Sequence, residues 1–141
     1  MKKLMVLCTG NSCRSQIAHG YFEKFSGNNI EVYSAGVETH GVNPRALLVM
    51  NEDGVDISNN TSNNILEYND ITFDFIITVC DSAKERCPYF PSKSLHIHHS
   101  FSDPASATGT EDQILDSFRE VRDEIKTFVR GFIKQYLSDI A

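Results

Sequence analysis

The N-terminal half of the chain alternates between apolar runs and segments with apolar residues at helical spacing. An apolar run at 4–7 and an alternating segment at 30–35 predict two strands. Between them, residues 16–25 carry apolar side chains at helical spacing and predict a helix. A second helix is expected over 45–53, because Asn43 can cap its first turn and a proline follows at the first helical position.

The C-terminal half continues the alternation and ends in a long amphipathic segment. Apart from Asp74, residues 73–79 form an apolar and β-branched run, which is typical of a strand buried on both faces. A helical turn over 81–86 and a weaker strand over 94–98 follow it. From residue 110 onward, apolar side chains keep to one helical face, which predicts a long final helix.

Strands that alternate with helices predict the α/β class, with a parallel sheet of about four strands and helices on both of its faces. We expect three layers in a single domain over residues 1–141, because the chain contains no repeat, low-complexity tract or linker. In such sheets the functional site lies at the carboxyl ends of the strands. The residues that follow 4–7 and 73–79 are therefore expected to be neighbours.

Composition and charge narrow the classes of function. With 141 residues, 40% hydrophobic and 23% charged, the chain fits one ordinary globular domain. Its net charge of -6 argues against nucleic acid or an anionic membrane as a partner. No apolar run approaches the length of a membrane helix or of a signal peptide. Four cysteines in a chain without a signal indicate a reducing compartment, so we expect a cytoplasmic protein.

The first loop (residues 8–15) carries the main candidate chemistry. Five residues separate Cys8 from Arg14, enough to curl the backbone so that its N–H groups point inward and bind a tetrahedral oxyanion. The same N–H groups and the helix dipole favour a thiolate at Cys8, the candidate nucleophile. Arg14 can clamp two oxygens of the anion, and Ser15 offers a hydroxyl donor to the thiolate. The predicted oxyanion-binding residues are Thr9, Gly10, Asn11, Ser12, Cys13, Arg14 and Ser15.

Cys80 and Cys87 separate a hydrolase from a thiol-redox protein. Cys80 ends the predicted strand region, and Cys87 lies next to Arg86 and Pro88, where burial is difficult. A hydrolase needs only the nucleophile, because water completes its cycle, whereas a reductase must reduce an oxidised sulfur by attack of further thiols. Both cysteines are candidates for such a relay, with inert buried thiols as the alternative. No Cys-x2-Cys pair is present, so a structural zinc site is not expected.

Two further groups of polar residues have simpler alternatives. Asp103 precedes a proline in a late loop, where an aspartate often starts a turn. Beside an oxyanion nucleophile, however, its carboxylic acid could protonate the leaving oxygen. His96, His98 and His99 are candidate metal ligands, but no further ligand accompanies them. We therefore interpret the histidines as a polar strand end and expect no metal site.

The motif Cys-x5-Arg-Ser in the first loop of so short a chain resembles that of the low-molecular-weight tyrosine phosphatase fold family. The longer string Cys-Thr-Gly-Asn-Ser-Cys-Arg-Ser-Gln is similar to that of the thioredoxin-coupled arsenate reductases built on that fold. Thr-Val-Cys at 78–80 and Cys-Pro at 87–88 match their redox segment. The resemblance spans nearly the whole chain. It implies an oxidoreductase for arsenic detoxification, with arsenate as substrate, thioredoxin as external reductant and no tightly bound cofactor.

In the mechanism that this resemblance implies, Cys8 attacks arsenate while Asp103 protonates the departing oxygen. Cys80 then attacks Cys8, which expels arsenite and leaves a Cys8–Cys80 disulfide. Cys87 attacks Cys80, and thioredoxin reduces the resulting Cys80–Cys87 disulfide. The alternatives are a phosphatase acting on aryl phosphates, here a weak side activity, and a non-catalytic thiol-redox sensor. Ala105 stands where the phosphatase branch is expected to carry an aromatic residue, which argues against the aryl phosphatase.

Some relatives also bind potassium, and this chain departs from their pattern. Asn11 and Ser34 match two positions that help to bind the ion. The carboxylates expected with them are replaced by His19 and Asn63. Because a hard cation prefers anionic oxygens, these replacements argue against potassium dependence.

Overall fold

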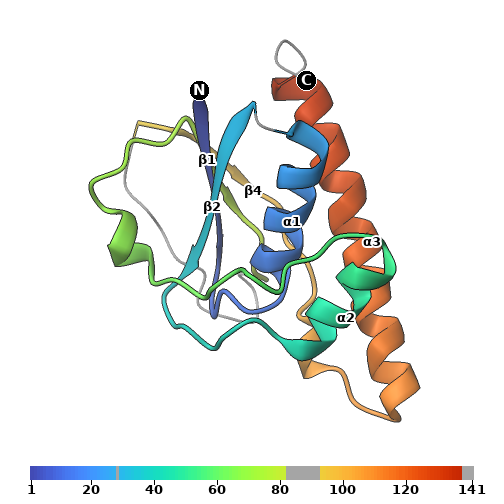
Figure 1. Ribbon diagram of the computed structural model, residues 1–141. Helices are drawn as coiled ribbons and strands as arrows, with labels where there is room; N and C mark the ends of the chain where they lie inside the picture. Colours follow the sequence, from blue (N-terminus) through green and yellow to red (C-terminus); the bar gives the residue numbers. More distant parts are fainter. Residues whose placement is uncertain (28, 82–92, 138–141) are drawn as a thin grey trace.

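The computed structural model describes residues 1–27, 29–81 and 93–137. These residues contain one sheet of four strands in the order β2-β1-β3-β4 (Figure 1). The strands are β1 (Lys2–Cys8), β2 (Ile30–Gly36), β3 (Phe75–Thr78) and β4 (Leu95–His98). All three neighbouring pairs are parallel, so the predicted four-stranded parallel sheet is confirmed.

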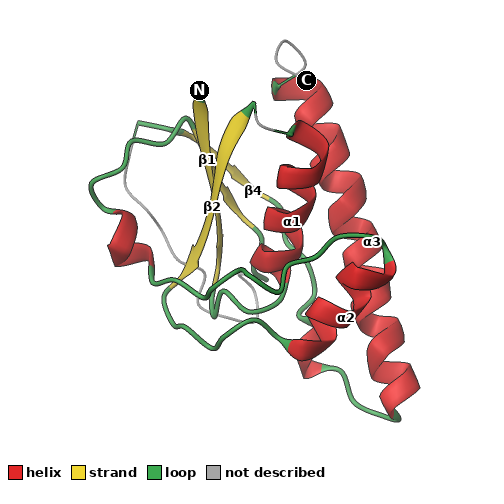
Figure 2. Ribbon diagram, in the orientation of Figure 1, coloured by secondary structure: helices red, strands yellow, loops and turns green. Residues whose placement is uncertain are grey.

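Three α-helices and two short 3-10 helices accompany the strands in the described residues (Figure 2). They are α1 (Arg14–Ser26), α2 (Pro44–Glu52), α3 (Glu111–Tyr136), η1 (Ile65–Tyr68) and η2 (Pro104–Ser106). The predicted cap of α2 is confirmed, because the Asn43 side chain accepts a hydrogen bond of 2.9 Å from the Arg45 N–H. At the start of α3, Thr110 and Gln113 form a capping box. None of these helices is both long and apolar enough to cross a bilayer.

The three α-helices pack together on one face of the sheet (Figure 1). Leu4, Val6 and Cys8 of β1 point to this face, as alternate residues of a strand must. The long helix α3 lies against both α1 and α2. Its N-terminal half is tied to α2 by two bidentate ion pairs, Arg45 with Glu111 and Arg119 with Glu52. The main hydrophobic core therefore lies between the sheet and these helices.

The second face of the sheet has a thinner cover within the described residues. Met5 and Leu7 of β1 point to it and pack in a cluster with η1 and the chain beside it. The rings of Tyr33, Tyr68 and Phe73 meet edge to face here, with centroids 5.2 to 6.5 Å apart. Where the sequence predicted helices on both faces, the described residues place a 3-10 helix on this one.

The carboxyl ends of β2, β1 and β3 lie at the same end of the sheet, which is where the sequence analysis expects the site. Cys8 pairs with Gly36 across β1 and β2, and Leu7 pairs with Thr78 across β1 and β3. The strand β3 is shorter than the predicted 73–79, because Phe73 packs instead into the aromatic cluster of the second face. Of the predicted helical turn 81–86, only its first residue is described, and Cys87 lies outside the described residues.

Candidate active site

A pocket of about 610 Å³ opens at the carboxyl ends of the strands. It is lined by the first loop, by side chains from 40–44 and 102–106, and by Asp81, which follows β3. Every one of these segments was far from the first loop in the sequence, so the fold assembles the pocket. The predicted site residues in its lining are Cys8, Thr9, Gly10, Ser12, Cys13, Arg14 and Asp103.

The first loop is held from outside by the segment that follows β2. Three backbone N–H groups of this segment donate hydrogen bonds to carbonyl oxygens of the loop. They run from Glu38 to Thr9 (3.0 Å), from His40 to Gly10 (3.2 Å) and from Asn43 to Ser12 (3.0 Å). In a trans peptide the N–H points away from the C=O. Carbonyl groups fixed on the outside therefore direct the following N–H groups inward, as an oxyanion site requires.

Gly36, the last residue of β2, lets the first loop approach the sheet closely. A Cβ at this position would lie 2.6 Å from the carbonyl oxygen of Thr9 and 2.8 Å from that of Cys8. It would also lie 2.9 Å from the backbone nitrogen of Asn11. Backbone atoms cannot move aside without moving the loop, so this position requires glycine. Nothing in the local sequence pattern distinguishes Gly36 from a simple strand end.

Asn11 and Ser15 of the first loop are fully buried. Asn11 has φ 46°, in the left-handed region that asparagine tolerates better than most residues. Its side chain donates to Ser15 Oγ at 2.7 Å and accepts from the Asn63 N–H at 2.8 Å. Because Ser15 Oγ accepts this bond, its own hydroxyl hydrogen remains available to another acceptor. Both side chains thus brace the loop, and their direct contact with an oxyanion stays a prediction.

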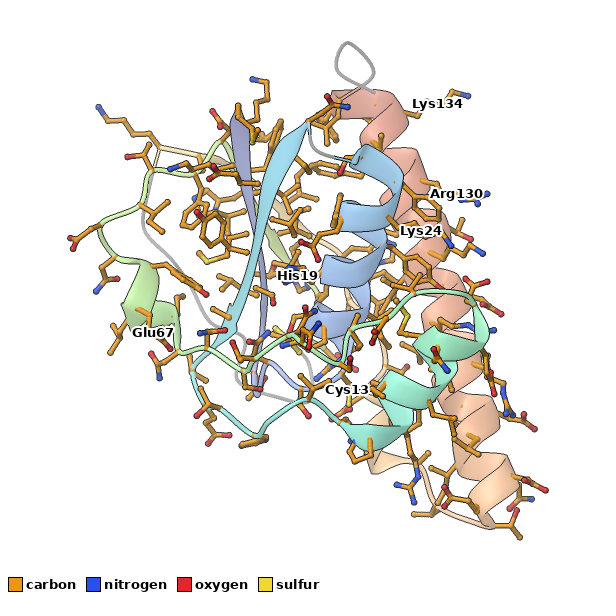
Figure 3. All side chains as sticks on the ribbon, in the orientation of Figure 1. Cys13, His19, Lys24, Glu67, Arg130 and Lys134 are labelled. Atoms are coloured by element: carbon orange, nitrogen blue, oxygen red, sulfur yellow. The ribbon has the colours of Figure 1, made fainter. Side chains whose placement is uncertain are left out.

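Two free thiols, Cys8 and Cys13, lie in the pocket wall and are almost completely buried. Cys8 ends β1, whereas Cys13 precedes α1 at the end of that helix nearest the site (Figure 3). Burial, with the negative charge of Asp103 as a smaller contribution, raises the pKa of the Cys13 thiol to about 12. Cys13 therefore stays protonated at neutral pH and is a poor nucleophile, which leaves Cys8 as the candidate.

The Arg14 guanidinium joins the first loop to the acid segment (residues 101–106). Its Nη1 donates a hydrogen bond of 3.1 Å to the carbonyl oxygen of Phe101, and its Nη2 lies 3.7 Å from Oδ2 of Asp103. The Phe101 ring is itself held by stacking on His99 and by an edge contact with Phe128. Arg14 is only 3% exposed, so its positive charge has a fixed place beside the predicted acid.

The position of Asp103 is compatible with both roles that the sequence left open. Its Oδ1 accepts a hydrogen bond of 3.0 Å from the Ala105 N–H and caps η2, as expected of an Asp-Pro turn. Its side chain is 39% exposed and lines the pocket, with Oδ2 on the side of Arg14. A carboxyl group in this position is accessible to a bound anion, which a proton donor must be.

Cys80 lies two residues after the end of β3 and is fully buried. The N–H of the preceding residue, Val79, donates to the Leu7 carbonyl at 3.0 Å, so Cys80 lies beside the end of β1 that carries Cys8. Cys80 is disulfide-bonded, whereas Cys8 is not. The structure thus places the first two predicted relay cysteines in neighbouring strand ends.

The two potassium candidates, Asn11 and Ser34, are engaged in other hydrogen bonds. Ser34 Oγ lies 2.8 Å from Nδ1 of His19, which sits between α1 and β2 (Figure 3). Nε2 of His19 lies 3.4 Å from Glu23, and the hydrogen bond from His19 lowers the pKa of that carboxyl. The Asn11 side-chain oxygen already accepts from the Asn63 N–H. The side-chain oxygens of both candidates therefore already take part in hydrogen bonds.

The histidines of β4 and its continuation have structural partners. Nδ1 of His98 lies 2.6 Å from the Thr78 hydroxyl, and the His99 ring stacks on Phe101 with centroids 4.4 Å apart. In the described parts of the chain, no group of three or more His, Cys, Asp or Glu side chains is placed to hold a metal ion. Two pocket residues, His40 and Asp81, carry no sequence motif, and only the fold reveals their position.

Comparison with known proteins agrees with this geometry. Residues 3–140 match the family described as low molecular weight phosphotyrosine protein phosphatase. The chain is similar to an arsenate reductase of Halalkalibacterium halodurans, with 46% identity over 131 residues, which cover 93% of this chain and 94% of the relative. A solved arsenate reductase in its phosphate-binding state is 32% identical, with a TM-score of 0.80 over 100% of both chains.

A thioredoxin-dependent arsenate reductase of Corynebacterium glutamicum also has this fold. It is 22% identical, with a TM-score of 0.69 over 96% of this chain and 61% of that one. At this identity the likeness concerns the fold alone. Because the family match and the relative from Halalkalibacterium both span nearly all of the sequence, the chain belongs to the low molecular weight phosphotyrosine protein phosphatase family.

Proposed function

We propose that this protein is an arsenate reductase that works by a cysteine relay. The observation that carries the proposal is that Cys8, Arg14 and Asp103 line one pocket, around a loop whose N–H groups are directed inward. They supply a nucleophile, an anion clamp and a proton donor for displacement at a tetrahedral oxyanion. The relative named arsenate reductase, at 46% identity, supports arsenate as that oxyanion.

The first step joins Cys8 to arsenate. The loop N–H groups and Arg14 hold the anion while the Cys8 thiolate attacks arsenic. One arsenate hydroxyl leaves as water after Asp103 gives it a proton. The adduct still holds arsenic(V), so no electron transfer has yet taken place.

Reduction takes place in the second step, when the Cys80 thiolate attacks the sulfur of Cys8. The sulfur–arsenic bond breaks, its electron pair stays on arsenic, and arsenite containing arsenic(III) leaves. A Cys8–Cys80 disulfide remains. The position of Cys80 beside the end of β1 supports this step, because the two sulfurs must approach within bonding distance.

In the last step the Cys87 thiolate attacks Cys80 and releases the Cys8 thiolate. Thioredoxin then returns the Cys80–Cys87 disulfide to two thiols, which consumes two electrons and two protons. The state of the cysteines supports this order, because Cys80 is disulfide-bonded while Cys8 is not. A thioredoxin partner also fits our expectation of a reducing compartment, the cytoplasm.

The decisive experiment measures the oxidation of reduced thioredoxin by arsenate, followed as NADPH consumption in the presence of thioredoxin reductase. We expect one NADPH to be consumed for each arsenite formed. Cys80→Ser and Cys87→Ser should each abolish multiple turnover and leave the hydrolysis of an aryl phosphate intact, because ester hydrolysis never oxidises sulfur. Normal arsenate turnover in both variants would exclude the relay.

Phosphate-ester hydrolysis is a second candidate activity, because Cys8, Arg14 and Asp103 suffice for it when water completes the cycle. Ala105 lines the pocket and offers no ring to stack on an aryl group, so we expect this activity to be weak. Fast aryl phosphate hydrolysis without arsenate-dependent oxidation of thioredoxin would make the protein a phosphatase. Absence of both reactions would favour a non-catalytic thiol-redox sensor.

A further inference from the structure

The ring of His40 lies directly over Gly10 of the first loop. A Cβ on Gly10 would lie 2.7 Å from Nδ1 of His40 and 3.2 Å from two ring carbons. Gly10 does not have a positive φ, unlike four other glycines of the described chain. Its backbone conformation is thus open to other residues, and the neighbouring imidazole is what leaves no room for a side chain.

Two main-chain hydrogen bonds and a side-chain contact hold the segment that carries this imidazole against the loop. The His40 N–H donates to the Gly10 carbonyl at 3.2 Å, and the Glu38 N–H donates to the Thr9 carbonyl at 3.0 Å. The two side chains also meet, with Nε2 of His40 2.9 Å from Oε2 of Glu38. Both members of the pair are therefore attached to consecutive peptide groups of the loop, and His40 also lines the pocket.

We propose that Glu38 and His40 are positioning residues that set the oxyanion affinity of the first loop. The ring covers Gly10 from outside and restricts a residue that would otherwise have more conformational freedom than any other. It thereby keeps the N–H groups around Gly10 in the inward orientation before the anion arrives, which lowers the entropy cost of binding. The proposal rests on the proposed function only in naming arsenate as the anion.

The first test measures anion binding without turnover. His40→Ala should weaken the binding of inorganic phosphate and of arsenate by about tenfold, within the range of coupling between contacting residues. The measurement is protection of the Cys8 thiol from iodoacetamide, and it works even if arsenate reduction fails. In steady-state assays KM should rise while kcat changes by less than about twofold. Thr39→Ala, in the same exposed segment, is the control that should leave affinity unchanged.

The second test is a double-mutant cycle between Gly10 and His40. Gly10→Ala should weaken phosphate binding in the wild-type background, because its methyl group meets the ring. In the His40→Ala background, Gly10→Ala should have little effect on phosphate affinity, because the ring that its methyl group would meet is absent. A general loss of folding would not produce this rescue. Thermal unfolding curves of all four proteins show whether any of them has lost stability. Additive effects, or unchanged phosphate affinity in His40→Ala, would overturn the proposal.

Discussion

The two segments that meet in the pocket are constructed in different ways. Most residues of the first loop are buried, and backbone hydrogen bonds from the segment after β2 and close contact with Gly36 hold the loop. The acid segment contacts the loop through the Arg14 guanidinium, and its Asp103 side chain is 39% exposed. The proposed nucleophile and anion site are thus fixed by main-chain structure, whereas the proposed proton donor is held by side-chain contacts. Changes that displace the backbone of the first loop should alter both folding and binding, and changes at Asp103 should alter chemistry alone.

The largest effect is expected from Cys8→Ser. A serine hydroxyl is a far weaker nucleophile than a thiolate, so arsenate reduction and aryl phosphate hydrolysis should both fall below detection. The fold should survive, because the change replaces one buried atom. Turnover assays beside a thermal unfolding curve test this, and substantial activity in either assay would place the chemistry outside the first loop.

Asp103→Asn tests the other side of the comparison. Loss of the proton donor should slow the reaction by about 10²-fold, most for a substrate with a poor leaving group. Asparagine caps helices as well as aspartate does, so the stability should stay within about 0.5 kcal/mol of the wild type. Rates for an activated and an unactivated aryl phosphate give the measurement. Equal losses for both substrates would argue against the acid role.

Gly36→Ala should harm the first loop through its backbone. The new methyl group would meet three main-chain atoms within 2.9 Å, which should cost about 1–3 kcal/mol of unfolding free energy and weaken phosphate binding. Gly131→Ala in α3 is the matched control, because nothing lies within 4 Å of its Cβ position. That control should stabilise the protein by about 0.5–1 kcal/mol. Denaturant unfolding gives the unfolding free energy of each variant. Equal values for the two variants would show that the first loop can move to accommodate the methyl group.

The smallest effect concerns pH and the second thiol of the pocket. The Cys13 pKa rises from 9.0 to about 12 on folding, so the unfolded chain loses this proton first as pH rises. The stability that comes from this site is complete below pH 9 and is lost as pH rises toward 12. Cys13→Ser should therefore show a shallower decline of unfolding free energy between pH 9 and 11. Parallel curves for the two proteins would contradict the strong burial of the thiol.

A part of the molecule could be predicted from the sequence when the residues that determine it lie close together in the chain. The first loop was predictable because Cys8 and Arg14 are close in sequence and follow a strand of strongly apolar residues. The cap of α2 at Asn43 was predictable for the same reason. By contrast, the importance of Gly36 and His40 depends on contacts with a loop about thirty residues earlier, and no local pattern records such contacts.

Other differences reflect tertiary packing that overrides local preference. The run 73–79 is interrupted by Asp74, and only Phe75–Thr78 forms β3, while Phe73 finds aromatic partners beside η1. Arg14 and Asp103 are likewise 89 positions apart in the sequence, and only the sheet topology brings them together in an ion pair. Sequence suggested the acid role for Asp103, but its distance from Arg14 is a property of the fold.

The place of β1 in the sheet has a consequence for the survival of the nucleophile. Neighbouring strands bond to β1 on both sides, and Cys8 is its last residue. Cys8 pairs with Gly36 of β2, and the preceding residue, Leu7, pairs with Thr78 of β3, so opening the main chain at this end would disturb both neighbouring strands. Chemical modification of Cys8 is therefore expected to take place from the pocket that this residue lines, where a bound anion would compete with the modifying reagent.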